Sequence, residues 1–438
     1  MGSPFRGADD RPQAPTEARE GARDEPGAGP ADSADVFVAR QPIFDPSQRV
    51  FGYELLFRSG FVNACDATHP TDATARVMDS TMSVFGFDRL TLGGRAFVNV
   101  TRDVLVNGSV LILPSDRTVL ELLETVAPDE DVVAACRKLK ALGYRLALDD
   151  FVEDDRRRCF VDLADMIKVD VLATPPDEQR ALVQRLARPG LAFVAEKVET
   201  PEAFHCALEA GYQYFQGYFF CRPVIVTARD VPSVKVHYLR LLAELHRPVR
   251  TLWQLEEIIK RDVGLSYKLL RYVNSAFAMR ARRIESLMEA LLLVGEDKLR
   301  AWASIVALSS MGGDKPAELA ALAVTRAKLC ELLATASSVT TNAAEAFLVG
   351  LFSLLDAIVG RPLPEILSGL GLSAEVTDTV LGGETPLRMI YELAVAQERA
   401  DWGVLDARAS ALGIPGVKSS ELYREAIAWA HTTCAQVA

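Results

Sequence analysis

The pattern of apolar and polar positions changes character about halfway along the chain. From residue 36 to about residue 221, short apolar runs of strand length alternate with segments whose apolar residues recur at helical spacing. Beyond about Pro223 the strand-like runs stop, and helical periodicity continues to the C-terminus. The pattern therefore predicts a mixed α/β first half and an all-α second half.

In the first half, two apolar runs at 36–43 and 50–57 flank an Asp-Pro turn signal and predict a β-hairpin. A helical pattern covers 73–85, and strands and helices then alternate. The predicted strands cover 96–100, 119–123, 145–148, 166–171, 191–198 and 214–220, and the predicted helices cover 131–142, 177–186 and 201–209. Near-continuous apolar strands separated by helices predict a parallel sheet that is covered on both faces.

Polar residues stand late in these predicted strands. Asp149 and Asp150 end the apolar run that begins at Arg145. The other positions are Asn99, Glu121, Lys168, Glu196 and Gln216. Each alone could be a cap or a satisfied core polar group, but in a (β/α)8 barrel the C-terminal strand ends form the active site. The alternative, a doubly wound open sheet, would need a Gly-rich phosphate loop, which the sequence lacks. We therefore expect a (β/α)8 barrel.

Composition adds limits on the class of protein. The length of 438 residues suits two domains, and a net charge of -11 argues against a nucleic-acid partner or an anionic membrane surface. The seven cysteines are scattered singly, which favours a reduced, cytoplasmic setting. No apolar run approaches a membrane span of about 20 residues. Residues 1–34 are rich in Pro, Gly, Ala and charge, so we expect a disordered tail.

The second half contains a series of amphipathic segments. Helices are predicted over 234–245, 252–260, 265–272, 287–294, 298–308, 317–333 and 343–358, and further helices follow to the C-terminus. We place the domain boundary between an α/β domain at 35–228 and an all-α domain at 229–438. A stripe on the first helix, Tyr238, Leu241, Leu242 and Leu245, either joins the helical core or packs partly on the barrel.

The segment from Tyr53 to Arg58 resembles the signature of EAL domains, which are barrel-shaped cyclic di-GMP phosphodiesterases and receptors. Leu55 replaces the usual Ala. The family pattern can be followed in order and spacing over residues 36–223, through Asn99, Glu121, Asp149-Asp150-Phe151, Lys168 with Asp170, Glu196 with Glu199, and Gln216. This set is much more specific than any one of its members.

The second half resembles HDOD domains, and the whole chain therefore looks like a bacterial EAL–HDOD fusion protein. The resemblance rests on 259–266, 269–275 and 290–301. HDOD domains are similar to the metal-dependent HD phosphohydrolases, but they have lost the metal ligands of those enzymes. In this sequence Ser353 and Leu354 stand where an HD enzyme would carry its His-Asp pair. The resemblance thus implies a module that binds an unknown protein partner.

The EAL resemblance implies a role for each residue of its pattern. Arg58 would pair with a substrate phosphate, and Gln216 would complete the pocket. Lys168 would orient the attacking water, and Glu196 would assist as a base or a ligand. Mg²⁺ or Mn²⁺ would be held by Glu54, Asn99, Glu121, Asp149 and Asp150.

One departure from the family concerns the loop after Phe151. EAL enzymes continue there with a Gly- and Ser-rich loop that shapes the second metal site, whereas this chain has the charged run 152–158. We therefore expect a signalling regulator that binds cyclic di-GMP with weak or no hydrolysis. An active metal-dependent phosphodiesterase and a scaffold that ignores the nucleotide remain as alternatives.

Overall fold

The structure is a computed structural model of the whole chain, and it describes residues 36–59, 87–152, 157–221, 233–246, 252–276, 284, 286–313 and 315–437. The residues from Asp35 to Ala438 form one compact unit. The tail before residue 35, the helical pattern over 73–85 and the boundary segment around residue 228 lie outside the described residues. The disorder of the tail and the position of the domain boundary therefore stay predictions.

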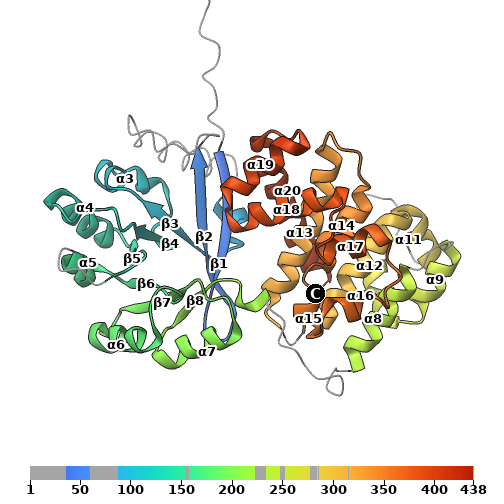
Figure 1. Cartoon of the computed structure of the whole chain (residues 1–438), viewed down its shortest axis with the longest axis horizontal. Coiled ribbons are helices and arrows are strands. Elements are labelled where there is room, and N and C mark those ends of the chain that lie inside the picture. Colours follow the sequence, from blue (N-terminus) through green and yellow to red (C-terminus); the bar gives the residue numbers. More distant parts are fainter. Residues whose placement is uncertain are drawn as a thin grey trace, which may run out of the picture. The chain divides into compact units, whose positions relative to one another are not determined.

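Eight strands close into a barrel in sequence order (Figure 1). They are β1 (Val36–Phe44), β2 (Val50–Ser59), β3 (Arg95–Val100), β4 (Thr118–Leu122), β5 (Arg145–Leu148), β6 (Met166–Asp170), β7 (Ala192–Glu196) and β8 (Tyr214–Gln216). The neighbours from β2 to β8 pair in parallel, while β1 is antiparallel to both β2 and β8. The predicted barrel is confirmed, and closure without edges excludes the open sheet.

Two details differ from the strand pattern of the sequence. The sheet is not parallel throughout, because the predicted hairpin forms and its first strand closes the barrel. The last strand ends at Gln216, not at Phe220. The reason is Gly217, which has a φ of 143° and passes so close to the Val198 backbone that any side chain there would overlap it. Phe219–Cys221 instead form a short 3₁₀ turn, η3.

The interior of the barrel is built in layers. An apolar layer contains Ile43, Phe97, Val119, Ala147, Met166 and Val194. Successive side chains on a strand point to opposite faces, so a residue two positions further along faces the interior again. Two positions beyond Phe97, Val119, Ala147, Met166 and Val194 stand Asn99, Glu121, Asp149, Lys168 and Glu196. The alternation that fills the core therefore also builds a polar layer at the carboxyl ends of the strands.

Helices connect the strands and cover the barrel, namely α2 (Phe87–Thr91), α3 (Arg102–Asn107), α4 (Glu130–Ala141), α5 (Arg158–Leu163), α6 (Pro176–Leu186) and α7 (Pro201–Ala210), with the 3₁₀ turn η1 (Ser109–Ile112) after α3. Local signals fix their ends. Asp129 caps α4 by accepting from the Val132 N–H, and Gly143 follows that helix with a φ of 95°. Thr200 caps α7, with Pro201 in its first turn and Gly211 at its end.

The second half is entirely helical within the described residues. It contains α8 (Ser233–Leu245), α9 (Leu252–Lys260), α10 (Val263–Ala276), α11 (Leu287–Val294), α12 (Glu296–Met311), α13 (Ala317–Ala336), α14 (Ala343–Phe352), α15 (Leu355–Val359), α16 (Leu363–Leu367), α17 (Ala374–Val380), α18 (Pro386–Arg399), α19 (Trp402–Leu412) and α20 (Gly416–Val437). Leu242 and Leu245 are fully buried, and α8 packs on α12 and α9, so the stripe on α8 belongs to the helical core.

One predicted helix is wrong in its length. The continuous helix expected over 343–358 is interrupted at Ser353 and Leu354, between α14 and α15. The Ser353 hydroxyl donates to the Gly350 carbonyl at 2.7 Å, and the Arg326 guanidinium donates to the same hydroxyl at 2.8 Å. Hydrogen bonds from a Ser side chain to the preceding turn compete with helix propagation, which explains the break.

The β1–β2 hairpin also contacts the helical half. The Tyr53 hydroxyl donates to the Glu318 carboxylate of α13 at 3.0 Å, and the Arg40 guanidinium lies 4.4 Å from the centre of the Tyr53 ring. The Tyr53 and Arg40 side chains are both buried. On β1 and β2 these residues alternate with Gln41 and Glu54, which face the barrel interior, so the hairpin has one face toward the polar layer and one toward the helices.

Candidate functional site

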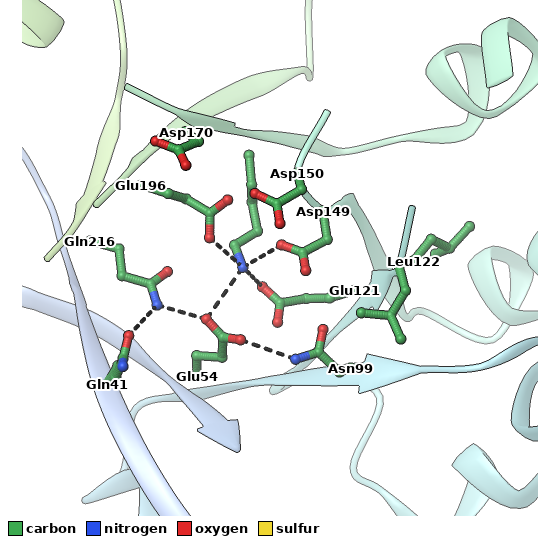
Figure 2. A network of polar contacts seen from close by, with 12 residues as sticks. Gln41, Glu54, Asn99, Glu121, Leu122, Asp149, Asp150, Asp170, Glu196 and Gln216 are labelled. Carbon is green, nitrogen blue, oxygen red and sulfur yellow. Dashed lines mark hydrogen bonds and ion pairs between the residues drawn. The ribbon is translucent and has the colours of Figure 1, made fainter. Parts of the chain in front are cut away.

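The polar layer forms a closed network at the carboxyl ends of the strands (Figure 2). At its centre lies the ammonium group of Lys168, which has no exposed surface. Its Nζ atom lies 2.7 Å from Glu121 Oε1, 2.7 Å from Asp149 Oδ1, 2.8 Å from Glu196 Oε1 and 3.3 Å from Glu54 Oε2. We call these four acids the carboxylate ring. Four separate strands thus bring an acid to one cation.

Two amides hold Glu54 from either side. Asn99 Nδ2 donates to Glu54 Oε1 at 3.0 Å, and Gln216 Nε2 donates to Glu54 Oε2 at 2.6 Å. Gln216 Nε2 also donates to Gln41 Oε1 at 3.1 Å. Both oxygens of Glu54 are therefore occupied, which fixes the side chain in one orientation.

The ring carries more negative charge than its cation can balance. Burial alone would raise the pKa of Glu54, but Lys168 and the two amides outweigh it and hold the pKa below its usual value. Burial and the charge of Glu54 raise the pKa of Glu121 well above its usual value. Burial also raises the pKa of Glu196 to about 7. Burial opposes the charge of Lys168, yet the surrounding acids raise its pKa, so the ammonium stays protonated.

Several oxygens of this layer are buried but have no hydrogen-bond partner among the described residues. They are Asn99 Oδ1, Glu121 Oε2, Glu196 Oε2 and Gln216 Oε1. An unsatisfied buried acceptor costs about 1–3 kcal/mol, and carboxylate and amide oxygens are the ligands that Mg²⁺ and Mn²⁺ prefer. In the described residues no three acids, histidines or cysteines surround one open metal position, because Lys168 takes the centre of the ring. The unpartnered oxygens nevertheless have the chemistry that a divalent cation requires.

A second cluster of charges stands next to the ring. The ammonium of Lys197 lies 2.5 Å from Asp170 Oδ2 and 3.9 Å from Asp150 Oδ1. Lys197 and Asp150 have positive φ angles of 56° and 41°, which side-chain-bearing residues adopt at a cost. Hydrogen bonding to Lys197 helps to hold the pKa of Asp170 below its usual value, against the effect of burial. Lys197 is thus a tethered cation beside Asp150.

The structure brings most of the residues expected from the sequence together. Glu54, Asn99, Glu121, Asp149, Lys168, Glu196 and Gln216 share one network, and Asp150 lies at its edge, half exposed (Figure 2). Their individual roles in metal or substrate binding stay predictions. The Arg58 side chain and residues 153–156 of the charged loop lie outside the described residues.

Three residues of the network had no assigned role in the sequence. Gln41 comes from β1, and only the closure of the barrel next to β8 places it beside Gln216. Asp170 shares the β6 strand with Lys168, and that two-residue spacing was a usable signal. Lys197 follows Glu196, and nothing in its sequence position indicates the backbone geometry that turns it toward Asp170.

In the helical half, a buried ion pair between Arg326 and Glu398 lies next to Ser353, one of the two residues at the position of the missing His-Asp pair. Arg326 contacts both carboxylate oxygens of Glu398, with a shortest distance of 2.6 Å, and it also donates to Ser353. Both charged side chains are at most 5% exposed. A buried Arg–Glu pair is satisfied within the protein, and no cluster of metal-binding side chains occurs among the residues the structure describes.

Comparison with known proteins identifies both halves. A family model of the EAL domain matches residues 101–223, and a family model of the HDOD domain matches residues 231–363. The chain belongs to the EAL–HDOD fusion proteins. The EAL match begins after β3, so Glu54 and Asn99 are placed in the site by the structure and not by that match.

Two curated relatives extend over most of the chain. The cyclic di-GMP phosphodiesterase CdgJ of Vibrio cholerae is 35% identical over 381 residues, which cover 86% of this chain and 88% of the relative. The uncharacterized protein YuxH of Bacillus subtilis is 34% identical over 404 residues, covering 90% and 98%. A solved EAL-domain protein from Listeria monocytogenes is 21% identical over 43% of this chain and 88% of that protein, with a TM-score of 0.37. No helix among the described residues is long and apolar enough to span a membrane.

Proposed function

We propose that the barrel of this EAL–HDOD protein binds cyclic di-GMP at the carboxylate ring with weak or no hydrolysis, and that the helical half passes the state of the barrel to a protein partner. The observation that carries the nucleotide site is the convergence of four acids, two amides and one lysine at the carboxyl ends of the strands. The relationship to CdgJ, which bears the name of a cyclic di-GMP phosphodiesterase, supports the choice of nucleotide.

The chemistry that we assign to the site is hydrolysis of one phosphodiester bond. A water oxygen bonds to phosphorus while a ribose oxygen leaves and takes a proton, which gives a linear dinucleotide. Mg²⁺ or Mn²⁺ held by Glu54, Asn99, Glu121, Asp149 and Asp150 would lower the pKa of water and neutralise phosphoryl charge. Glu196, whose pKa is raised to about 7, suits proton transfer near neutral pH, and Lys168 positions the attacking water.

Slow turnover is supported by the region around Asp150. Lys197 places a positive charge beside Asp150, one of the acids proposed to hold the metal, and beside Asp170. A cation there repels a metal ion and competes with it for Asp150. The charged run 152–158 replaces the Gly- and Ser-rich loop of the family, and small displacements of a metal or nucleophile reduce catalysis strongly. The tethered lysine favours binding over cleavage.

A fully active phosphodiesterase is the second candidate. It is favoured by the carboxylate ring, in which each strand-end acid of the family pattern is present and oriented inward. Under this reading Lys197 moves away when substrate binds, and its half-exposed side chain has room to do so.

The β1–β2 hairpin supports the output role of the helical half. Glu54 in the site and Tyr53 at the helices are consecutive residues of one strand, so a shift of β2 moves both. A nucleotide that binds two positions of this strand unequally would change the helical half as well. Tyr53→Phe, which removes the hydroxyl bonded to Glu318, should weaken that coupling without removing a site residue.

The test of the nucleotide site combines binding and turnover. Purified full-length protein is titrated with cyclic di-GMP and Mn²⁺ by calorimetry, and the mixture is then analysed for linear product. Binding without appreciable product supports the proposal. Rapid conversion would establish the second candidate, and absence of binding would leave the nucleotide-independent scaffold that the sequence also allows.

A matched pair of variants locates the site. Glu121→Gln removes a fully buried acid of the ring, whereas Glu124→Gln removes an exposed acid three residues later in the same segment. Loss of one ligand charge should weaken Mn²⁺-dependent binding at least about 10-fold in Glu121→Gln and leave Glu124→Gln unchanged. Equal affinities for the two variants would place the nucleotide elsewhere.

A further inference from the structure

A second connection between the barrel and the helices begins just after β8. The Tyr218 hydroxyl donates to the backbone carbonyl of Glu398, in the last turn of α18, at 2.9 Å. The last four carbonyls of a helix have no partner inside the helix, so Tyr218 satisfies one of them. The Arg399 guanidinium lies 5.3 Å from the centre of the Tyr218 ring and holds that ring against the end of α18.

The end of β8 joins Tyr218 firmly to the carboxylate ring. Gln216, two residues earlier, donates to an acid of the ring at 2.6 Å (Figure 2). Between the two, the Gly217 backbone passes so close to Val198 that no side chain fits there. The Val198 N–H donates to the Gln216 carbonyl at 2.9 Å, and the Phe219 N–H donates to the Val198 carbonyl at 3.0 Å. A displacement of Gln216 is therefore carried to Tyr218 instead of being absorbed between them.

Glu398 continues the connection through its side chain. Its carboxylate accepts three hydrogen bonds from Arg326 of α13, at 3.0, 3.0 and 2.6 Å. Arg326 also donates to Ser353, at the break between α14 and α15, at 2.8 Å. A buried pair of this kind holds both partners in one geometry, because moving either partner leaves a buried charge unpaired. The contacts thus run without interruption from the carboxylate ring to the α14–α15 junction.

A small cavity borders both this connection and the Tyr53 contact with α13. Its volume is about 20 Å³, and its lining includes Tyr218 and Glu398 of the one and Arg40 and Glu318 of the other. A volume of this size accommodates about one water molecule, which polar walls can keep hydrogen-bonded. Close-packed atoms cannot shift without strain, so the cavity gives the Tyr218 side chain room to move.

We propose that Tyr218 is a coupling residue, which links Gln216 at the carboxylate ring to the α14–α15 junction by a route separate from Tyr53. The inference rests on the proposed function for the role of the ring as the sensing end, whereas the link itself exists without nucleotide. A change at either end should reach the other, because coupling between two sites acts in both directions. The test therefore uses no nucleotide, and a failure to bind cyclic di-GMP would remove the proposed function without deciding this link.

The experiment is hydrogen exchange of the full-length protein, read at the amides of residues 350–355 in the α14–α15 junction. Tyr218→Phe removes only the hydroxyl and should speed this exchange about 5-fold, the effect of one lost buried hydrogen bond on local opening. Tyr144→Phe is the matched control. The Tyr144 hydroxyl also donates to backbone carbonyls, at 2.6 and 3.1 Å, but both belong to the barrel, so exchange at 350–355 should stay unchanged.

The direction from the ring is tested with the two amides that hold Glu54. Gln216→Ala and Asn99→Ala each remove one of these amides, but only Gln216 lies on the strand that continues to Tyr218. Gln216→Ala should speed exchange at 350–355 at least about 3-fold, and Asn99→Ala should leave it unchanged. In the Tyr218→Phe background, Gln216→Ala should add nothing further, because the route is already cut.

The opposite direction is tested at Ser353. Ser353→Ala removes the hydroxyl that Arg326 contacts, and it should speed exchange of the amides 216–219 at least about 2-fold. Ser368→Ala is the matched control. Both hydroxyls donate to the carbonyl three residues earlier, whereas Ser353 in addition accepts from Arg326. Ser368→Ala should therefore leave exchange at 216–219 as in the wild type.

Two results overturn the proposal. One is an equal change of exchange at 350–355 in Gln216→Ala and Asn99→Ala, which would show that β8 has no special route to the helices. The other is wild-type exchange at 350–355 in Tyr218→Phe. If Gln216→Ala does not fold, Tyr218→Phe and Ser353→Ala still decide the question, since each removes only a hydroxyl group.

Discussion

Replacing Lys168 with methionine tests the electrostatic design of the site. Methionine has a similar length and no charge, so the substitution leaves the carboxylate ring without its buried cation. Lys168 lies within 3.3 Å of four carboxylates and has no exposed surface. Removing one partner from a buried ion pair typically costs about 3–5 kcal/mol, because the remaining charge has lost its partner but cannot reach water.

The magnitude can be worked from protonation. The cheapest response of the ring is to protonate one further carboxyl group. With an ordinary glutamate pKa of 4.5, protonation at pH 7 costs about 3.4 kcal/mol, and at pH 5.5 about 1.4 kcal/mol. The native variant then binds more protons than its unfolded chain, so its stability relative to wild type falls as the pH rises. The loss should therefore be about 2 kcal/mol larger at pH 7 than at pH 5.5.

The assay is urea unfolding of both proteins in the presence of a chelator at the two pH values. Lys140→Met is the matched control, because Lys140 also lies 2.7 Å from a carboxylate but is about one-third exposed, so its pair should contribute under about 1 kcal/mol. Mn²⁺ should restore more stability to Lys168→Met than it adds to the wild type. If Lys168→Met unfolds within about 1 kcal/mol of wild type at pH 7, with no pH dependence, the charge argument is wrong.

Three further predictions concern single residues. His246 has a native pKa near 4 and an ordinary value of 6.5, so the free energy of unfolding of the wild type should fall by about 2 kcal/mol as the pH falls to 5. Urea unfolding midpoints should show this loss. The loss should disappear in His246→Gln and persist in His237→Gln, which changes an exposed histidine. Gly350→Ala, whose new methyl would lie 2.6 Å from the facing helix backbone, should destabilise the protein by about 1–3 kcal/mol in thermal unfolding, against little change for Gly369→Ala. Lys197→Gly should raise the number of Mn²⁺ ions bound, measured by electron paramagnetic resonance, and an unchanged count would remove the tethered-cation argument.

The sequence predicted the residues of the site better than it predicted how distant strands pair and where helices break. The polar positions were visible because a strand repeats every two residues, so Glu121 and Lys168 must face inward if Val119 and Met166 do. The pairing of β1 with β8, which closes the barrel, was not visible, since the two strands lie far apart along the chain. The break before α15 depends on Arg326 reaching Ser353 from another helix. Contacts between distant segments decide such features, and local patterns do not contain them.

The network residues that sequence reasoning missed have the same origin. Gln41 has no local signal, because its neighbour Gln216 is 175 residues away. Lys197 depends on a positive φ, which sequence pattern alone rarely indicates for a lysine. Strand periodicity therefore indicates which acids face the barrel interior. The contacts that Gln41 and Lys197 add to the site depend on barrel closure and backbone geometry.

Because alternate residues of the β1–β2 hairpin point to opposite faces, a mutational scan of this hairpin should show effects that alternate from one position to the next. Gln41 and Glu54 point into the barrel, whereas Arg40 and Tyr53 point toward the helices. Under the proposed function, neighbouring positions on one strand should therefore produce different phenotypes: ligand loss at one, and altered signal output with ligand binding preserved at the next. A one-residue insertion in this hairpin would exchange the two faces and so separate the proposed nucleotide site from the proposed output in a single step.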